Sequence, residues 1–202
     1  MDLDRQLPNY LIHFILHRLE DTVGKNGTST ILKYSGNDRL LDNYPPRDYE
    51  MGEPIRTFTG IITALIEVYG ENGFRALMRG VGVESFHIMI EELPFLLGIG
   101  EIDYESMEPK QRFITMYKFF ADKMNEFFQA NTVLEITDNR ILDTPEECTW
   151  CIGVTTKRPV CIFTEDFYTA MAKWLEFDAV TIREIECVAT GDPFCKYETI
   201  ME

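Results

Sequence analysis

Hydrophobic residues in the first two thirds of the chain recur at the spacing of amphipathic helices, and polar stretches with Gly or Pro separate these segments. Residues 47–54 have no such period and are expected to form a loop. The first helix is expected to stop near Gly24, the second at Pro45-Pro46 and the fourth at Pro94, since proline cannot continue a helix. The pattern predicts helices over residues 8–24, 29–44, 58–70 and 72–93.

The helix predicted over residues 108–130 has the most regular apolar face. Apolar residues occupy positions i, i+3, i+4, i+7, i+11, i+14 and i+15, which share one side of a helix. Such a face either packs into the core or lines an apolar pocket, because pockets are also lined by aromatic residues and Met. The residues are Phe113, Met116, Tyr117, Phe120, Met124, Phe127 and Phe128.

From about residue 132 the hydrophobic period shortens to that of strands. Short strands are predicted over 132–139, 140–144 and 147–154, followed by a helix over 164–177 with Thr164 as its N-cap. Segments 179–189 and 194–200 then form a hairpin around the turn "TGDP". The prediction is one α+β domain over residues 1–202, with a helical N-terminal two thirds packed on a small antiparallel sheet.

Charge narrows the classes of partner. The chain has 34 acidic and 19 basic residues and a net charge of -15. This balance argues against nucleic acid and against an anionic membrane surface, since both are bound largely through Lys and Arg. No apolar segment approaches the roughly 20 residues that span a bilayer, and the acidic first residues do not resemble a signal peptide. A cytoplasmic protein without a membrane span is expected.

Five cysteines lie in the last third of the chain. An odd number without an export signal indicates metal binding or reactive thiols in preference to a disulfide framework. The alternative is that each thiol only fills space in the core. The cysteines are Cys148, Cys151, Cys161, Cys187 and Cys195.

The predicted hairpin can bring Cys187 and Cys195 together across its turn, with Glu184 three residues ahead of Cys187. The apolar phase of "VTIREIECVA" slips by one residue, which predicts a β-bulge near residues 183–185. The bulge would let Glu184 and Cys187 face the same side. Zinc takes four ligands, and Cys161 is the best fourth candidate, because the N-terminus of a following helix favours a thiolate.

Cys148 and Cys151 form a second thiol pair in the sequence "CTWC". A C-x-x-C pair is typical of half a zinc site or of a redox pair. Because the pair falls in a predicted strand, it does not match the strand-helix junction of thioredoxin-like proteins. Cys151 is also an alternative to Cys161 as a ligand.

"PVC", a gap of 22 residues and "EIECVATGDPFCKY" together resemble the 4-vinyl-reductase domain, including its form in the sensory module of phenol- and xylene-responsive activators. The likeness is specific over about residues 132–200. It implies a structural zinc held by Cys161, Glu184, Cys187 and Cys195. It also implies the broader fold of haem-NO-binding and Golgi transport-complex proteins, a pocket for small hydrophobic molecules and a tendency to form homodimers.

The chain departs from these families in several ways. It has no phosphate-binding loop and no helix-turn-helix, so any output would pass through a partner protein. A nicotinamide or flavin fingerprint is absent as well, which argues against reductase activity. The Tyr-x-Ser-x-Arg motif of the haem-binding family is also missing, although His87 could serve as a pocket group or haem ligand.

The expected function is therefore that of a zinc-stabilised domain that binds or senses a small hydrophobic or aromatic molecule. One alternative is an enzyme or accessory protein of tetrapyrrole metabolism, and another is an interaction module without a ligand; enzymatic activity is not the favoured expectation. The residues expected to line the pocket are Phe113, Tyr117, Phe120, Met124, Trp150, Phe163, Phe167, Tyr168 and Met171.

Overall fold

The structure is a computed structural model that describes residues 3–128 and 131–202, with the side chains of Phe127 and Phe128 outside the description. The chain divides into two compact units, which are described separately. The first contains residues 1–77 and 149–156, and the second contains residues 78–148 and 157–202. That the chain is a single domain stays a prediction.

The first unit consists of two long helices and a short strand pair. Strands β1 (Gln6–Pro8) and β2 (Met51–Pro54) pair antiparallel and precede helices α1 (Asn9–Tyr34) and α2 (Ile55–Met78). Each helix is interrupted by a glycine in the left-handed region, Gly24 with φ 74° and Gly70 with φ 70°. The predicted stop at Gly24 is therefore a break within α1, and the chain turns helical again directly after it.

Two predictions for this unit are wrong. Residues 35–44 are not helical, because α1 ends at Tyr34 and only the short 3-10 helix η1 (Asp38–Leu40) follows. Gly36 has a φ of 69°, and the Asn37 side chain donates to the Ser35 hydroxyl at 2.9 Å, so local turn geometry replaces the helix. The expected loop over residues 47–54 ends in strand β2. The local sequence pattern does not predict that β2 pairs with β1.

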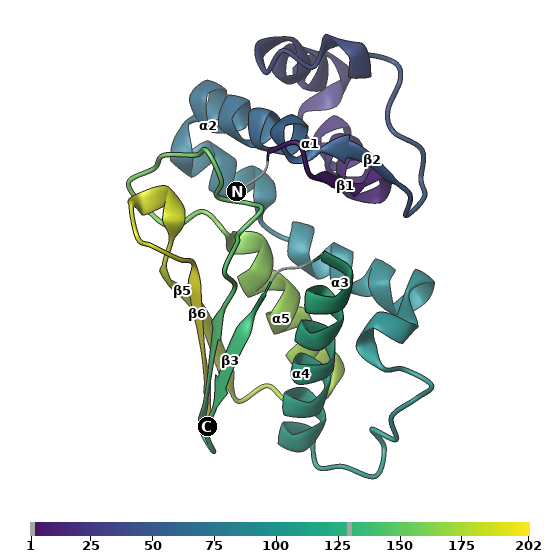
Figure 1. The fold of residues 1–202 in the computed structure, drawn as a ribbon, viewed down its shortest axis with the longest axis vertical. Helices are drawn as coiled ribbons and strands as arrows, with labels where there is room; N and C mark the ends of the chain where they lie inside the picture. Colours follow the sequence, from purple (N-terminus) through teal and green to yellow (C-terminus); the bar gives the residue numbers. More distant parts are fainter. Residues whose placement is uncertain (1–2, 129–130) are drawn as a thin grey trace. The chain divides into compact units, whose positions relative to one another are not determined.

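The second unit is a four-stranded antiparallel sheet covered by helices on one face (Figure 1). The helix α5 packs against β5, α3 and α4. This arrangement of helices on a small antiparallel sheet confirms the predicted α+β class. The sheet order is β3-β4-β6-β5, and the elements are α3 (Val81–Glu92), η2 (Pro94–Leu97), α4 (Pro109–Phe128), β3 (Val133–Ile136), β4 (Arg140–Thr144), α5 (Ile162–Trp174), β5 (Val180–Glu186), η3 (Val188–Thr190) and β6 (Lys196–Met201).

Three predictions for the chain after residue 70 are also corrected. The helix predicted over 72–93 is broken at Gly80, whose φ of 82° separates α2 from α3. The strand predicted over 147–154 does not form, since the chain has no helix or strand between β4 and α5. The helix predicted to start at Thr164 begins at Ile162, so Cys161 itself occupies the N-cap position.

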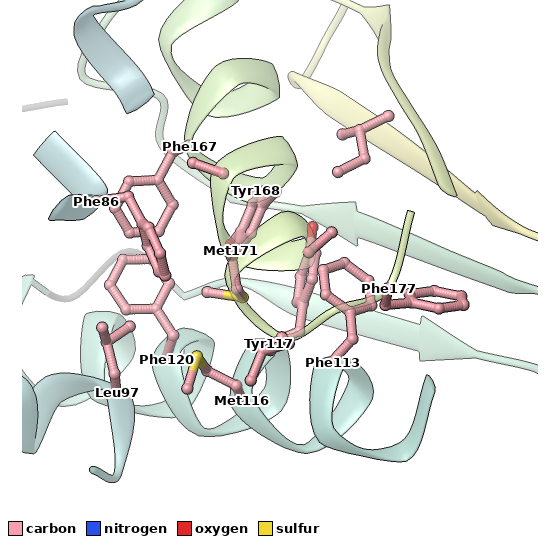
Figure 2. Packing of buried hydrophobic residues seen from close by; sticks show 14 of the residues in the cluster. Phe86, Leu97, Phe113, Met116, Tyr117, Phe120, Phe167, Tyr168, Met171 and Phe177 are labelled. Carbon is pink, nitrogen blue, oxygen red and sulfur yellow. The ribbon is translucent and has the colours of Figure 1, made fainter. Parts of the chain in front are cut away.

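Aromatic side chains from α3, α4 and α5 form the core of the second unit (Figure 2). Phe167 packs edge-on against Phe86 at 5.4 Å between ring centroids and stacks on Phe120 at 4.8 Å. Phe113 and Tyr117 of α4 are fully buried. The apolar face of α4 is therefore part of the core, which was one of its two predicted roles.

Helices α3 and α5 approach closely because Gly82 has no side chain. A Cβ atom at Gly82 would lie 2.1 Å from the Phe163 carbonyl oxygen and 2.6 Å from the Phe167 nitrogen. The same pair of helices is joined by Asp166, whose Oδ2 accepts the Gly80 N–H at 2.7 Å, just ahead of α3. The N-terminal half of α5 is thus held against the start of α3 by backbone contact and a charged cap.

We expect G82A to lower the free energy of unfolding by about 3 kcal/mol, because backbone atoms of α5 cannot move aside as a flexible side chain could. Chemical denaturation measures the change. Gly60 provides the matched control, since it lies inside α2 and its nearest neighbour to an added Cβ is the Asn37 amide nitrogen at 3.4 Å. G60A should change stability by less than about 1 kcal/mol. Equal losses in both variants would contradict the close-packing argument.

Candidate metal centre

Three thiols and one carboxylate meet in the interior of the second unit. One ligand atom from each of Cys161, Glu184, Cys187 and Cys195 lies within 4.8 Å of the others, and all four residues are buried. Cys161 is at the N-terminus of α5, Glu184 is on β5, and the other two cysteines flank the connection between β5 and β6. The sequence predicted these four residues as ligands of one zinc ion, and that they bind a metal stays a prediction.

A β-bulge turns Glu184 and Cys187 to the same side. The register of β5 against β6 shifts between Glu184 and Glu186, which leaves Ile185 as the extra residue. Ile185 is 46% exposed, whereas Glu184 is 9% exposed and Cys187 is fully buried. The predicted bulge is confirmed, and its effect on the two side chains is the predicted one.

Hydrogen bonds within the hairpin connection fix Cys187 and Cys195. Asp192 accepts the Cys187 N–H at 2.9 Å, and the Thr190 hydroxyl donates to the Cys187 carbonyl oxygen at 2.8 Å. The Val188 N–H points at the Cys195 sulfur at 3.5 Å. A backbone donor at this position favours the thiolate over the thiol.

Glu184 is the most constrained group of the cluster. Its Oε2 accepts the Cys161 N–H at 2.9 Å, whereas its buried Oε1 has no hydrogen-bond partner among the described residues. Burial, followed by the charge of Cys187, raises the pKa of the Glu184 carboxyl to about 9, and the Cys161 N–H opposes this rise. A buried oxygen without a partner costs free energy, and a cation between the carboxylate and the thiols would remove that cost.

The spacing fits a single tetrahedral ion. Zinc–sulfur bonds of about 2.3 Å place two bound sulfurs roughly 3.8 Å apart, which is within the 4.8 Å span of the cluster. Cys161 also caps α5, so the helix dipole favours a thiolate there. The residues therefore fit a zinc ion by donor type, number, spacing and the unsatisfied carboxylate oxygen.

The remaining two cysteines lie in the irregular segment before α5. The sulfur of Cys148 is 3.3 Å from the sulfur of Cys161 and 3.9 Å from the Tyr197 hydroxyl. Cys151 is fully buried in segment 149–156, which is grouped with the first unit. None of the five cysteines, all of which the structure describes, is in a disulfide. The prediction that "CTWC" lies in a strand is wrong, because Cys148 precedes a turn and Cys151 lies within it.

A second buried polar group was not singled out from the sequence. Asp143 on β4 is 4% exposed, and its Oδ2 accepts hydrogen bonds from Tyr117 at 2.8 Å and Tyr168 at 3.2 Å. The two tyrosine rings stack with 3.9 Å between centroids. Asp143 shares the inward phase of β4 with the fully buried Ile141, so a charged residue at a core position was the available signal.

Asp143 and Glu184 belong to one row across the sheet. Strand pairing places Leu134 opposite Asp143, Asp143 opposite Tyr197, and Tyr197 opposite Glu184. Tyr197 is buried, and burial together with the nearby thiols raises its pKa well above its ordinary value. The inner face of the sheet therefore carries three adjacent polar side chains that end at the candidate metal centre.

Most of the residues predicted to line a ligand pocket belong to the core of the second unit. The exception is Trp150, which lies in segment 149–156 and packs edge-on against Phe58 at 4.8 Å. That these side chains line a pocket stays a prediction. The core residues are Phe113, Tyr117, Phe120, Phe167, Tyr168 and Met171, with Met124 and Phe163 partly buried against them.

The chain has the fold of H-NOX domains. It matches a mutant H-NOX of T. tengcongensis (14% identity, TM-score 0.60, 97% of this chain and 98% of that chain). It also matches a mutant Fe(II) unliganded H-NOX of K. algicida (12%, TM-score 0.61, 97% of each chain) and an H-NOX from Shewanella woodyi in the Fe(II)CO state (17%, TM-score 0.57, 96% and 94%). No protein-family model and no curated protein matches the chain.

None of the described helices is long and apolar enough to cross a membrane.

One of the similar structures concerns haem distortion in the H-NOX family, so haem is the cofactor that this fold implies. The described residues do not fit it in either unit. His87 and His17 are exposed, and the ring of the half-buried His13 is engaged with the Pro45 carbonyl oxygen at 2.8 Å. No role for haem follows from these residues.

Burial raises the pKa of Asp143 from 3.8 to about 6, and the two tyrosine hydroxyls oppose the rise. The folded chain thus holds this proton more tightly than the unfolded chain. The contribution of Asp143 to stability is complete below about pH 4 and is lost as the pH rises through about 6. From pH 4 to pH 8 we expect the free energy of unfolding of D143N to gain up to about 3 kcal/mol relative to the unmodified chain. Denaturation at several pH values measures this gain.

The control is D178N, which removes an exposed carboxylate just after α5. Its stability relative to the unmodified chain should not follow the same curve. An unmodified chain and D143N with parallel pH profiles would show that Asp143 does not titrate in this range.

Proposed function

We propose that this chain is a zinc-stabilised domain for binding or sensing a small molecule. Cys161, Glu184, Cys187 and Cys195 bind one zinc ion. The observation that carries the proposal is the meeting of three buried thiols and a buried carboxylate within 4.8 Å, with one carboxylate oxygen otherwise unpartnered among the described residues.

The donor set favours a structural role for the zinc. Four protein ligands complete a tetrahedral site and leave no position for a reacting water, as catalytic zinc requires. Three thiolates and a carboxylate carry four negative charges against two on the ion. The N-terminus of α5 and the Val188 N–H partly offset this excess. The ion would join the start of α5 to both ends of the β5–β6 connection.

Thiolate ligands need a reducing compartment, because oxidation to disulfides would remove the donors. Together with the acidic surface charge, this requirement favours the cytoplasm as the site of action.

The small-molecule part of the proposal rests on the fold and on the composition of the second unit's core. Similar H-NOX structures are described in CO-bound and NO-bound states. In this chain, Tyr117, Tyr168 and Asp143 place a few polar groups within an aromatic and Met-rich cluster, which is the usual composition of a ligand site. The proposed ligand is a small apolar or aromatic molecule, bound by a homodimer with a separate output partner.

As-isolated protein should contain one zinc per chain, measured by native mass spectrometry without chelator, which also reports subunit number and any retained ligand. C187S should lose the zinc and much of the stability, since structural zinc sites supply about 10–16 kcal/mol of apparent binding free energy in small zinc domains. C148S is the matched control, because Cys148 is a buried thiol outside the proposed ligand set. A metal-free protein, or an unchanged melting temperature in C187S, would overturn the zinc assignment.

Ligand binding is tested with phenol and toluene, which differ by a hydroxyl donor. Calorimetric titration should detect both. Y168F should weaken the binding of phenol by about tenfold and leave toluene unchanged, because only phenol can use the polar group at Asp143. Failure of both probes to bind, with no retained organic mass, would favour an interaction module. Retained pigment absorbing visible light would instead favour a role in tetrapyrrole metabolism.

A further inference from the structure

Cys148 has no part in the proposed zinc coordination, yet its sulfur is 3.3 Å from that of the ligand Cys161. This separation is shorter than the roughly 3.8 Å expected between two sulfurs bound to one zinc. A disulfide needs about 2.05 Å, so the two sulfurs must close by little more than 1 Å. Both residues lie in the second unit, Cys148 in the irregular segment after β4 and Cys161 directly before α5.

Cys148 is also the thiol of this group that solvent reaches first. As a residue Cys148 is 5% exposed, whereas Cys161, Cys187 and Cys195 are each 0% exposed. The three ligand thiols are further protected when a metal holds them. A small oxidant therefore meets Cys148 before it meets a ligand, with Cys161 in position to react next.

We propose that Cys148 and Cys161 form a reversible disulfide that opens the metal site when a peroxide oxidises the thiols. This regulation rests on the proposed zinc function of the same site. A disulfide at Cys161 removes one of four donors and detaches the start of α5 from the β5–β6 connection. The three remaining donors, Glu184, Cys187 and Cys195, hold zinc more weakly, so the ion leaves.

The chemistry balances with hydrogen peroxide as the two-electron oxidant. The Cys148 sulfur attacks one peroxide oxygen, the O–O bond breaks, and Cys148 becomes a sulfenic acid as one water leaves. The Cys161 sulfur, released from the metal, then attacks the Cys148 sulfur and displaces a second water. Two thiols lose two electrons and two protons, and one peroxide becomes two waters. A dithiol reductant reverses the bond by exchange.

The test treats zinc-loaded protein, free of reductant, with hydrogen peroxide at increasing molar ratios. A chromophoric chelator follows zinc release, and intact mass should fall by about 2 Da for the two hydrogens lost. Peptide mapping should find the Cys148–Cys161 disulfide, and dithiothreitol with added zinc should restore the metal. In C148S, zinc release should be at least about tenfold slower, because the first-reacting thiol is absent. C151S, which changes a buried thiol three residues away, should still form the same disulfide.

A Cys187–Cys195 disulfide as the main product, or release from C148S at the rate of the unmodified protein, would overturn the proposal. Peptide mapping separates failure of the redox proposal from failure of the zinc assignment. If the isolated protein binds no zinc, the zinc assignment fails. Peroxide treatment of the metal-free chain then tests separately whether the Cys148–Cys161 disulfide forms. If zinc binds and peroxide yields no such bond, the zinc site stands and the regulation falls. Mapping in the unmodified protein also decides the question should C148S fail to fold.

Discussion

The candidate metal centre is organised around one contact, the hydrogen bond from the Cys161 N–H to the Glu184 carboxylate at 2.9 Å. It joins the first residue before α5 to the bulged strand β5, two segments separated by more than twenty residues. Glu165, in the first turn of the same helix, accepts the Glu184 N–H at 2.7 Å and repeats the link. The start of α5 is thereby fixed in position, and the thiols around it are brought into range of one ion.

The inner face of the sheet carries two buried carboxylates. The free-energy cost of burying each one is compensated in a different way. Asp143 receives two tyrosine hydroxyls, so its charge is shared within the protein. Glu184 keeps one oxygen without a hydrogen-bond partner among the described residues and lies beside three thiols. The first carboxylate is satisfied by protein donors, whereas a cation beside the second would satisfy its remaining oxygen. Tyr197 on β6 lies between Asp143 and Glu184, because β6 pairs with β4 on one side and with β5 on the other.

The fold and the site carry different kinds of information about function. The H-NOX fold is shared with proteins that are 12–17% identical to this chain, a level at which the backbone path is retained and the chemistry is not implied. Specific contacts hold helices α3 and α5 together. They are the close approach at Gly82, which has no side chain, and the hydrogen bond by which Asp166 caps α3. The candidate metal centre is a separate feature, located where the last helix meets the last hairpin.

The sequence by itself determined the helical period, the final hairpin, the bulge at Ile185 and the four candidate ligands. Each of these depends on residues near one another in the chain or on a motif with fixed spacing. Only the tertiary structure decided that Cys148 contacts Cys161, that Asp143 receives Tyr117 and Tyr168, and that residues 35–44 and 147–154 are irregular. Such contacts join segments far apart in sequence, and no local period records which of them will meet.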